Sequence, residues 1–219
     1  MRAVIFDMDG LMFDTESVFM KAWDYAGEKA GLGKAGYMAL KTLGLNVAMS
    51  QKVWEDEFGD RYDAATIRKY SKDFLTKYYS ENKVPVKKGL YVLLDYLKGE
   101  GYKMAVASSS SRQEVESHLK DADVFDYFQA IICGDMVKHS KPEPEIYLKA
   151  CELLQENPKD CYALEDSRNG LLAAHRAGCN PIMVPDLWQP DEEIEKLILG
   201  KFSNLEEVKD FISTQTFIP

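Results

Sequence analysis

The sequence predicts an α/β fold, with a Rossmann-like parallel sheet core and an inserted all-helical cap domain. From about residue 86 onward, short apolar runs alternate with segments of helical periodicity. That order is typical of a parallel sheet with helices on both faces. Residues 15–80 show helical patterns only, and they follow a first apolar run at 3–6. The helical block therefore interrupts the α/β part directly after its first strand.

Each element is predicted from the spacing of its apolar residues and from the polar or glycine residues that end it. Strands are expected at 3–6, 103–107, 130–133, 161–164 and 181–184, and helices near 112–120, 145–156, 168–177 and 205–213. Within the helical block, helices are expected from about Thr15 to Gly31 and near 37–43, 48–58 and 66–79. The predicted domains are an α/β core formed by 1–14 and 81–219 and a cap formed by 15–80.

Two carboxylates follow the first predicted strand. Asp7 and Asp9 are two residues apart, and Gly10 allows a sharp turn behind them. Ligands of open α/β sheets bind at the carboxyl ends of the strands. Acids at this place suit a divalent metal and attack on an electrophile. Taken alone, Asp-Gly is also common in ordinary turns.

A run of serines follows the second predicted strand of the core. Ser108 and Ser109 belong to the run 108–111, which opens a helix. Hydroxyl groups and free backbone N–H groups at a helix N-terminus can hold a phosphate. Serine is also favoured as a helix cap, so the run by itself fits either interpretation.

Two later motifs complete the set. Lys141, which precedes a proline, comes after the predicted strand 130–133 and could neutralise a phosphate. Glu165 and Asp166 follow the strand 161–164 and would add oxygen ligands for magnesium. Each of these residues alone would be an ordinary surface or first-turn residue. Their order after four strands of one sheet favours a common site.

This ordered set closely resembles the haloacid dehalogenase superfamily of phosphohydrolases, over essentially the whole chain. Within it, the sequence is similar to the β-phosphoglucomutase-like and sugar-phosphatase group with a helical cap. The resemblance implies that Asp7 is the nucleophile and Asp9 the general acid and base. It further implies that Ser108, Ser109 and Lys141 bind phosphate. The implied ligands of Mg²⁺ are Asp7, Asp9 through its carbonyl, Glu165 and Asp166.

The resemblance leaves two fates for the phosphoryl group. Mutases of this group carry a His four residues before a cap Trp, and an Arg beyond a cap Gly. Here Phe19 stands four residues before Trp23, and the stretch after Gly44 has Val47 and no Arg. We therefore expect a phosphatase acting on small phosphomonoesters, with sugar phosphates foremost. The alternative is a hexose-phosphate mutase of the β-phosphoglucomutase type.

A phosphorylated receiver domain is a second alternative from a different class. Such binding switches also place an Asp, a Ser or Thr and a Lys on a parallel sheet. They lack an acid two residues after the nucleophile and an inserted helical block. Asp9 and the block 15–80 argue against that interpretation.

Composition limits the partners. The 219 residues carry a net charge of −9, and no Lys/Arg-rich run occurs, which disfavours nucleic acid and anionic membranes. The four cysteines have no paired spacing, as in a reducing cytosol. We expect a cytoplasmic monomer without a signal peptide or membrane span, whose partner is a small phosphorylated metabolite.

Overall fold

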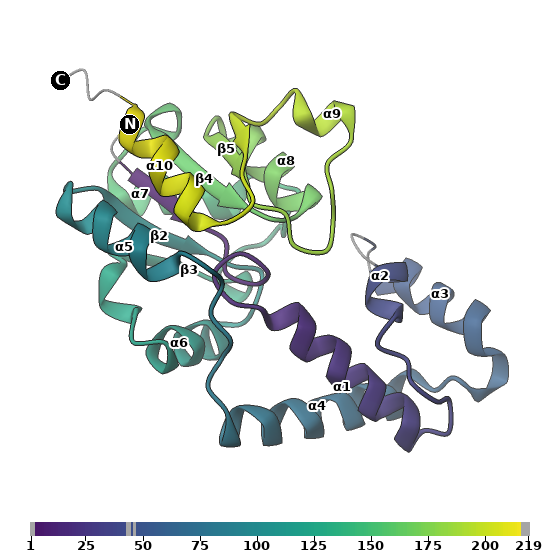
Figure 1. Cartoon of the computed structure of the whole chain (residues 1–219). Coiled ribbons are helices and arrows are strands. Elements are labelled where there is room, and N and C mark those ends of the chain that lie inside the picture. The colour runs from purple at the N-terminus through teal and green to yellow at the C-terminus, as the bar shows by residue number, and fades with distance from the viewer. Residues whose placement is uncertain (1–2, 43–44, 46, 216–219) are drawn as a thin grey trace. The chain divides into compact units, whose positions relative to one another are not determined.

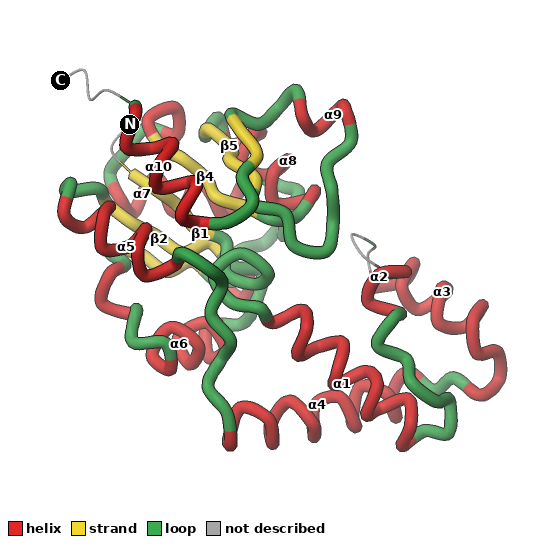
Figure 2. Tube along the Cα trace, in the orientation of Figure 1, coloured by secondary structure: helices red, strands yellow, loops and turns green. Residues whose placement is uncertain are grey.

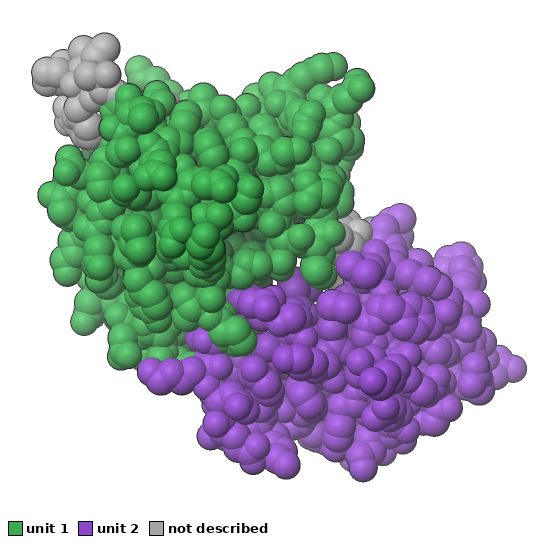
Figure 3. Space-filling view, in the orientation of Figure 1, with its two compact units in different colours: residues 1–13, 85–219 green, residues 14–84 purple. Residues whose placement is uncertain are grey.

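The computed structural model describes residues 3–42, 45 and 47–215 (Figure 1). The chain divides into two compact units, one formed by 1–13 and 85–219 and the other by 14–84 (Figure 3). Among the described residues, no helix is both long and apolar enough to cross a membrane.

The first unit contains one parallel sheet. Its strands are β1 (Ala3–Phe6), β2 (Lys103–Ala107), β3 (Ala130–Ile132), β4 (Cys161–Glu165), β5 (Asn180–Met183) and β6 (Gly200–Lys201). Their order in the sheet is β3-β2-β1-β4-β5-β6, and every pair is parallel. The predicted Rossmann-like sheet is confirmed. The two-residue strand β6 was not predicted, because so short a segment has no periodicity to detect.

Helices precede, connect or follow the later strands of this unit (Figure 2). They are α5 (Leu90–Gly99), α6 (Arg112–Asp121), α7 (Glu145–Leu154), α8 (Arg168–Ala177), α9 (Glu192–Glu195) and α10 (Leu205–Thr214). Short 3₁₀ turns lie at 125–127, 134–136 and 158–160. The bounds that were predicted in this unit agree with the structure to within two residues, whereas α9 was not predicted.

The core of the first unit is built from alternate strand residues. Ala3 and Ile5 point to the face covered by α7 and α8, together with Ala105, Ala163 and the buried side of α7. Figure 1 shows α5 and α10 on the other face. Cys133, Cys151, Cys161 and Cys179 are buried free thiols, which agrees with their apolar sequence context.

The second unit is all-helical. It contains α1 (Thr15–Lys29), α2 (Met38–Thr42), α3 (Val47–Phe58) and α4 (Ala64–Glu81), with a 3₁₀ turn at 59–61. Its core centres on Trp54, whose ring lies 5.2 Å from that of Trp23 in an edge-to-face arrangement. The predicted helix 37–43 ends at Thr42 in the described residues, and Leu43 and Gly44 lie outside them.

The register of the sheet determines where the site residues lie. Phe6 of β1 is level with Val106 of β2 and Leu164 of β4. The next residue, Asp7, extends the ladder, because its backbone N–H donates to the Leu164 carbonyl at 2.9 Å. Asp7 is therefore level with the last residues of both neighbouring strands.

Candidate active site

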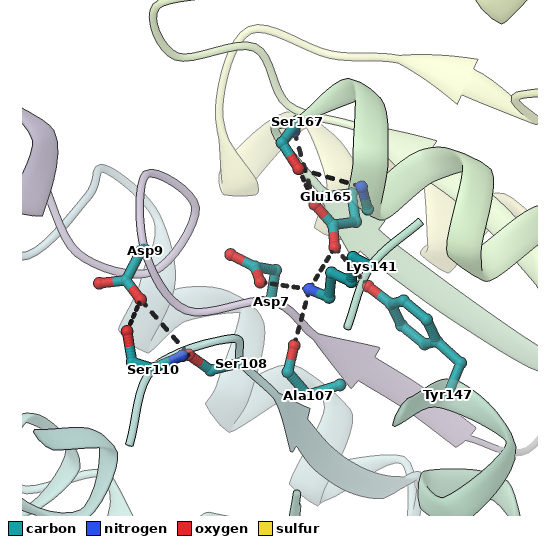
Figure 4. A network of polar contacts seen from close by, with 10 residues as sticks. Asp7, Asp9, Ala107, Ser108, Ser110, Lys141, Tyr147, Glu165 and Ser167 are labelled. Carbon is teal, nitrogen blue, oxygen red and sulfur yellow. Dashed lines mark hydrogen bonds and ion pairs between the residues drawn. The ribbon is translucent and has the colours of Figure 1, made fainter. Parts of the chain in front are cut away.

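Lys141 is the centre of a buried polar network at the carboxyl ends of the strands (Figure 4). Its Nζ atom lies 2.6 Å from Asp7 Oδ1, 2.6 Å from Glu165 Oε1 and 2.9 Å from the Ala107 carbonyl oxygen. These three acceptors match the three N–H donors of an ammonium group. Although burial lowers the pKa of Lys141, the charges of Asp7 and Glu165 outweigh it and raise the pKa, so the lysine is charged.

Glu165 is fully buried and has protein donors at both oxygens. Oε1 accepts from Lys141 and from the Tyr147 hydroxyl at 2.6 Å. Oε2 accepts from the Ser167 hydroxyl at 3.1 Å and from its backbone N–H at 3.4 Å. A methyl group at Gly170 would overlap this carboxylate, so the start of α8 requires a glycine there. Glu165 is the last residue of β4, one position later than the predicted strand end.

Sequence reasoning missed Tyr147. It is a fully buried residue of α7, and its ring also faces the Lys141 ammonium at 5.3 Å. In the sequence it lies within the apolar stripe of a helix, where an ordinary core tyrosine would give the same pattern. No sequence signal distinguished these two roles.

Asp9 lies apart from the Lys141 network and faces the serines. Its Oδ2 atom accepts from the Ser110 hydroxyl at 2.7 Å and from the Ser108 hydroxyl at 3.3 Å. The Ser108 oxygen accepts from the Ser110 backbone N–H at 3.0 Å, which closes a small ring of contacts (Figure 4).

The serine run is divided between two roles. Ser111 caps α6 in a capping box with Glu114, as the helix-cap interpretation expects. Ser108 is fully buried beside Asp9, whereas the side chain of Ser109 is exposed. Ser110, which the sequence analysis did not select, makes the shorter bond to Asp9. Phosphate binding by Ser108, Ser109 and Lys141 stays a prediction.

Three acids converge on one point. Asp7, Glu165 and Asp166 each offer an oxygen within 4.8 Å of the others. Burial raises the pKa of Asp7 from 3.8 to about 8, opposed by Lys141. Burial also raises the pKa of Asp166 well above its usual range, and the charge of Asp7 acts in the same direction. Buried acids that repel one another in this way would gain from a cation between them.

A fourth acid lies beside this group. Asp186 follows β5 by three residues, and its Oδ1 atom is bound by Lys87 Nζ at 2.7 Å. Among the described residues its Oδ2 atom is buried without a hydrogen-bond partner. A methyl group at Gly10 would lie 3.3 Å from that atom and would overlap Asp166 Oδ2. An orphaned oxygen and a glycine-lined space next to Asp166 both fit a hydrated divalent cation.

The strand-end rule could have found Asp186 from the sequence. The residue follows the predicted strand 181–184 by two positions, just as Asp166 follows the predicted strand 161–164. Its neighbours are a proline and a run of apolar residues, and no second acid drew attention to it.

The fold and the site together define an enzyme of phosphate-ester chemistry built on a Rossmann-like sheet. Residues 1–178 match the haloacid dehalogenase-like hydrolase family, and the chain belongs to that family. The predicted resemblance is confirmed. The chain is a phosphoric monoester hydrolase.

Similar proteins extend over most of the chain. It is 33% identical over 190 residues to the putative phosphatase YhcW of Bacillus subtilis (strain 168), and the alignment covers 84% of each chain. It is 30% identical over 182 residues to a phosphorylated carbohydrates phosphatase of Thermotoga maritima, covering 83% of this chain and 84% of the relative. The crystal structure of a putative beta-phosphoglucomutase from Thermotoga maritima matches with a TM-score of 0.82 and 26% identity. That match covers 99% of this chain and 100% of the other.

Proposed function

We propose that the protein is a magnesium-dependent phosphatase of small phosphomonoesters, sugar phosphates foremost, which works through an aspartyl phosphate on Asp7. One observation carries this proposal: the Asp7 carboxylate ends the central strand between a buried lysine and two further acids. A nucleophile, a cation and a metal-type acid group are the parts that phosphoryl transfer to a carboxylate needs.

The acids suit one magnesium ion. Asp7, Asp166 and the Asp9 carbonyl would hold it, with Glu165 within reach of the same point. Bound magnesium would offset the repulsion between a phosphate dianion and these carboxylates. Because both Glu165 oxygens accept protein hydrogen bonds, we also assign Glu165 the role of holding Lys141.

Asp7 attacks phosphorus in line, the bond to the leaving alcohol breaks, and the alcohol oxygen takes a proton from Asp9. Asp9 then removes a proton from water, which attacks the phosphoryl group and releases Asp7. The two hydroxyls of Ser108 and Ser110 hold the Asp9 carboxylate in a fixed orientation for both steps. Lys141 and the N–H groups after Ser108 would neutralise the phosphate oxygens.

The helical unit is proposed to be a cap that selects the substrate and excludes water during transfer. Phe19, at the position where mutases of the group carry His, is a 40% exposed residue of α1. The sequence also departs from the mutase pattern near Gly44 and Val47. The side chains at these positions lie outside the part of the chain that the structure describes. A phenylalanine offers a sugar phosphate no hydrogen bond, which favours release of the alcohol and hydrolysis by water.

The relatives support hydrolysis of sugar phosphates, since one is named a phosphorylated carbohydrates phosphatase. The mutase alternative keeps support from the structure named a putative beta-phosphoglucomutase. We further propose a monomer in a reducing cytosol, to which four buried free thiols are suited.

The test is release of inorganic phosphate from a panel of sugar and nucleotide monophosphates, with and without magnesium. We expect turnover of several sugar phosphates that a chelator abolishes, and none in Asp7→Asn. That variant should keep the far-UV circular dichroism spectrum of the wild type. Undiminished turnover in Asp7→Asn would overturn the nucleophile assignment.

A second assay separates phosphatase from mutase. β-Glucose 1-phosphate is supplied with a trace of glucose 1,6-bisphosphate, and both products are followed. We expect free phosphate to exceed glucose 6-phosphate. Rapid formation of glucose 6-phosphate with little free phosphate would establish the mutase instead.

A further inference from the structure

Among the described residues, only one of the two oxygens of the Asp186 carboxylate has a hydrogen-bond donor. Lys87 satisfies only Oδ1, at 2.7 Å, and the Asp186 side chain is 12% exposed. Among the described residues Oδ2 has no donor. A buried charged oxygen without a donor is costly, so such an atom calls for a ligand that supplies one.

The space in front of Asp186 Oδ2 is bordered by Asp166, one of the three acids that could hold a metal ion. A side chain at Gly10 would meet Asp166 Oδ2 and Asp186 Oδ2 together, so both oxygens border the space that this glycine leaves. The positive φ of Gly10, +80°, also disfavours any other residue there. Among the described residues no donor reaches Asp186 Oδ2 across this space, and a water molecule bound to a cation would supply one.

Lys87 fixes this carboxylate from the other side. Its backbone N–H donates to the Met12 carbonyl at 2.9 Å, next to the bridge between Phe13 and Val86. This hydrogen bond and this bridge join the segment by which the chain leaves the first unit to the segment by which it returns. The Lys87–Asp186 pair thus holds Asp186 at a defined place beside Asp166.

We propose that Asp186 is a positioning residue of the metal site, which accepts a hydrogen bond from a water molecule of the hydrated ion through Oδ2. Magnesium usually keeps several of its waters in proteins, and partners outside the ligand shell tune metal affinity. The inference rests on the proposed function, because it concerns the same site. It adds to that site a residue whose proposed role is toward the water of the metal ion and not toward the transferred phosphoryl group.

The experiment measures Mn²⁺ binding without substrate, by titration followed by electron paramagnetic resonance of the free ion. Asp186→Asn removes the charge at constant shape. We expect Asp186→Asn to weaken Mn²⁺ binding by about tenfold or more. The matched control is Asp191→Asn, which removes an exposed acid from the same loop and keeps a residue able to cap α9. The control should bind Mn²⁺ as the wild type does.

The melting temperature of the metal-free protein is a second readout. Asp186→Asn keeps an oxygen for Lys87 and removes a charge that repels the Asp166 carboxylate, so this variant should melt no lower than the wild type without metal. The double variant Lys87→Met/Asp186→Leu replaces both charges with apolar groups and provides a test if the single variant does not fold. It should also bind Mn²⁺ more weakly.

Wild-type affinity in both Asp186 variants would overturn the inference, as would a wild type that binds no Mn²⁺. The outcomes separate this inference from the proposed function. Weakened Mn²⁺ binding without any phosphatase activity would refute the function and keep Asp186 at the metal. Phosphatase activity with unchanged Mn²⁺ binding would refute only the role of Asp186.

Discussion

Every N–H group of Lys141 already has an acceptor, so a phosphate bound there as proposed would have to replace one of them. The Ala107 carbonyl is the neutral one of the three, while Asp7 and Glu165 hold the ammonium by charge. A phosphate dianion competes best with the neutral acceptor. The lysine would therefore keep its two carboxylates and turn one N–H toward the ligand.

Tyr147→Phe tests whether the network depends on the hydroxyl at Glu165. The ring stays, and one hydrogen bond to a buried carboxylate is lost, which costs about 1.5–3 kcal/mol of unfolding free energy. We expect that loss in urea unfolding and a severalfold lower kcat, because Lys141 is held less firmly. Tyr162→Phe is the control, since Tyr162 is buried on β4 but points to the opposite face from Glu165. Equal effects of the two variants would contradict the role of Tyr147.

Gly170→Ala tests the close approach between α8 and Glu165. Alanine normally favours a helix over glycine by about 1 kcal/mol. Here its methyl group would overlap the Glu165 carboxylate, so we expect lower stability and lost turnover. At Gly99, the last residue of α5, a methyl group would meet no atom within 4 Å. Gly99→Ala should be neutral or stabilising, and the sign difference in thermal melting is the measurement.

At the scale of elements, the first turn of α7 holds the loop that carries Lys141. The Glu145 carboxylate accepts from the backbone N–H groups of Lys138 and His139 at 3.0–3.1 Å, and pairs with Lys149 one turn later at 3.0 Å. The hydrogen bond from Lys149 has the largest effect, and together with these N–H groups it lowers the pKa of Glu145 from 4.5 to about 2. A single acid thus joins the helix to the loop before it.

Glu145→Gln should lower the melting temperature at neutral pH. Because the folded-state pKa of Glu145 lies below the unfolded value, its contribution is complete above about pH 4.5 and is lost as the pH falls toward 2. The difference between wild type and variant should therefore be constant from pH 5 to 8 and shrink below that range. Glu152→Gln removes an exposed carboxylate from the same helix as the control. A difference that grows on acidification would contradict this assignment.

At the scale of the whole molecule, the parallel sheet collects groups from distant parts of the chain. Asp7 and Lys141 are 134 residues apart, and Ser110 and Asp9 are 101 residues apart. Strand ends of one parallel sheet share an edge, which is the reason that such separations close. The helical unit has its own core around Trp54.

Phe19→Ala tests the proposed cap. If the helical unit selects substrates, this change in α1 should alter kcat/KM for sugar phosphates by several fold and leave p-nitrophenyl phosphate hydrolysis nearly unchanged. Leu148→Ala is the control, because Leu148 is 44% exposed on α7 of the other unit. Its substrate preferences should match those of the wild type. Identical preferences in all three proteins would remove the evidence for a selective cap.

The order of strands and helices and the acids at the strand ends were predictable from the sequence alone. Apolar periodicity and the position of a carboxylate after a strand are local properties, so Asp7, Asp9 and Asp166 stood out. The same rule predicted Glu165, but it did not predict the hydrogen bond that Tyr147 donates to the Glu165 carboxylate.

Only the tertiary structure determines which buried polar groups pair with one another. Tyr147 and Ser110 meet their carboxylates because helix packing and sheet register bring distant residues together. Tyr147 has no distinctive local pattern, and nothing in the serine run distinguishes Ser110 from its neighbours. Asp186 also follows a predicted strand, but only the structure shows that one of its oxygens is buried without a donor among the described residues. Periodicity predicts which face of an element is buried, whereas the pairing of buried polar groups depends on the three-dimensional positions of all the elements.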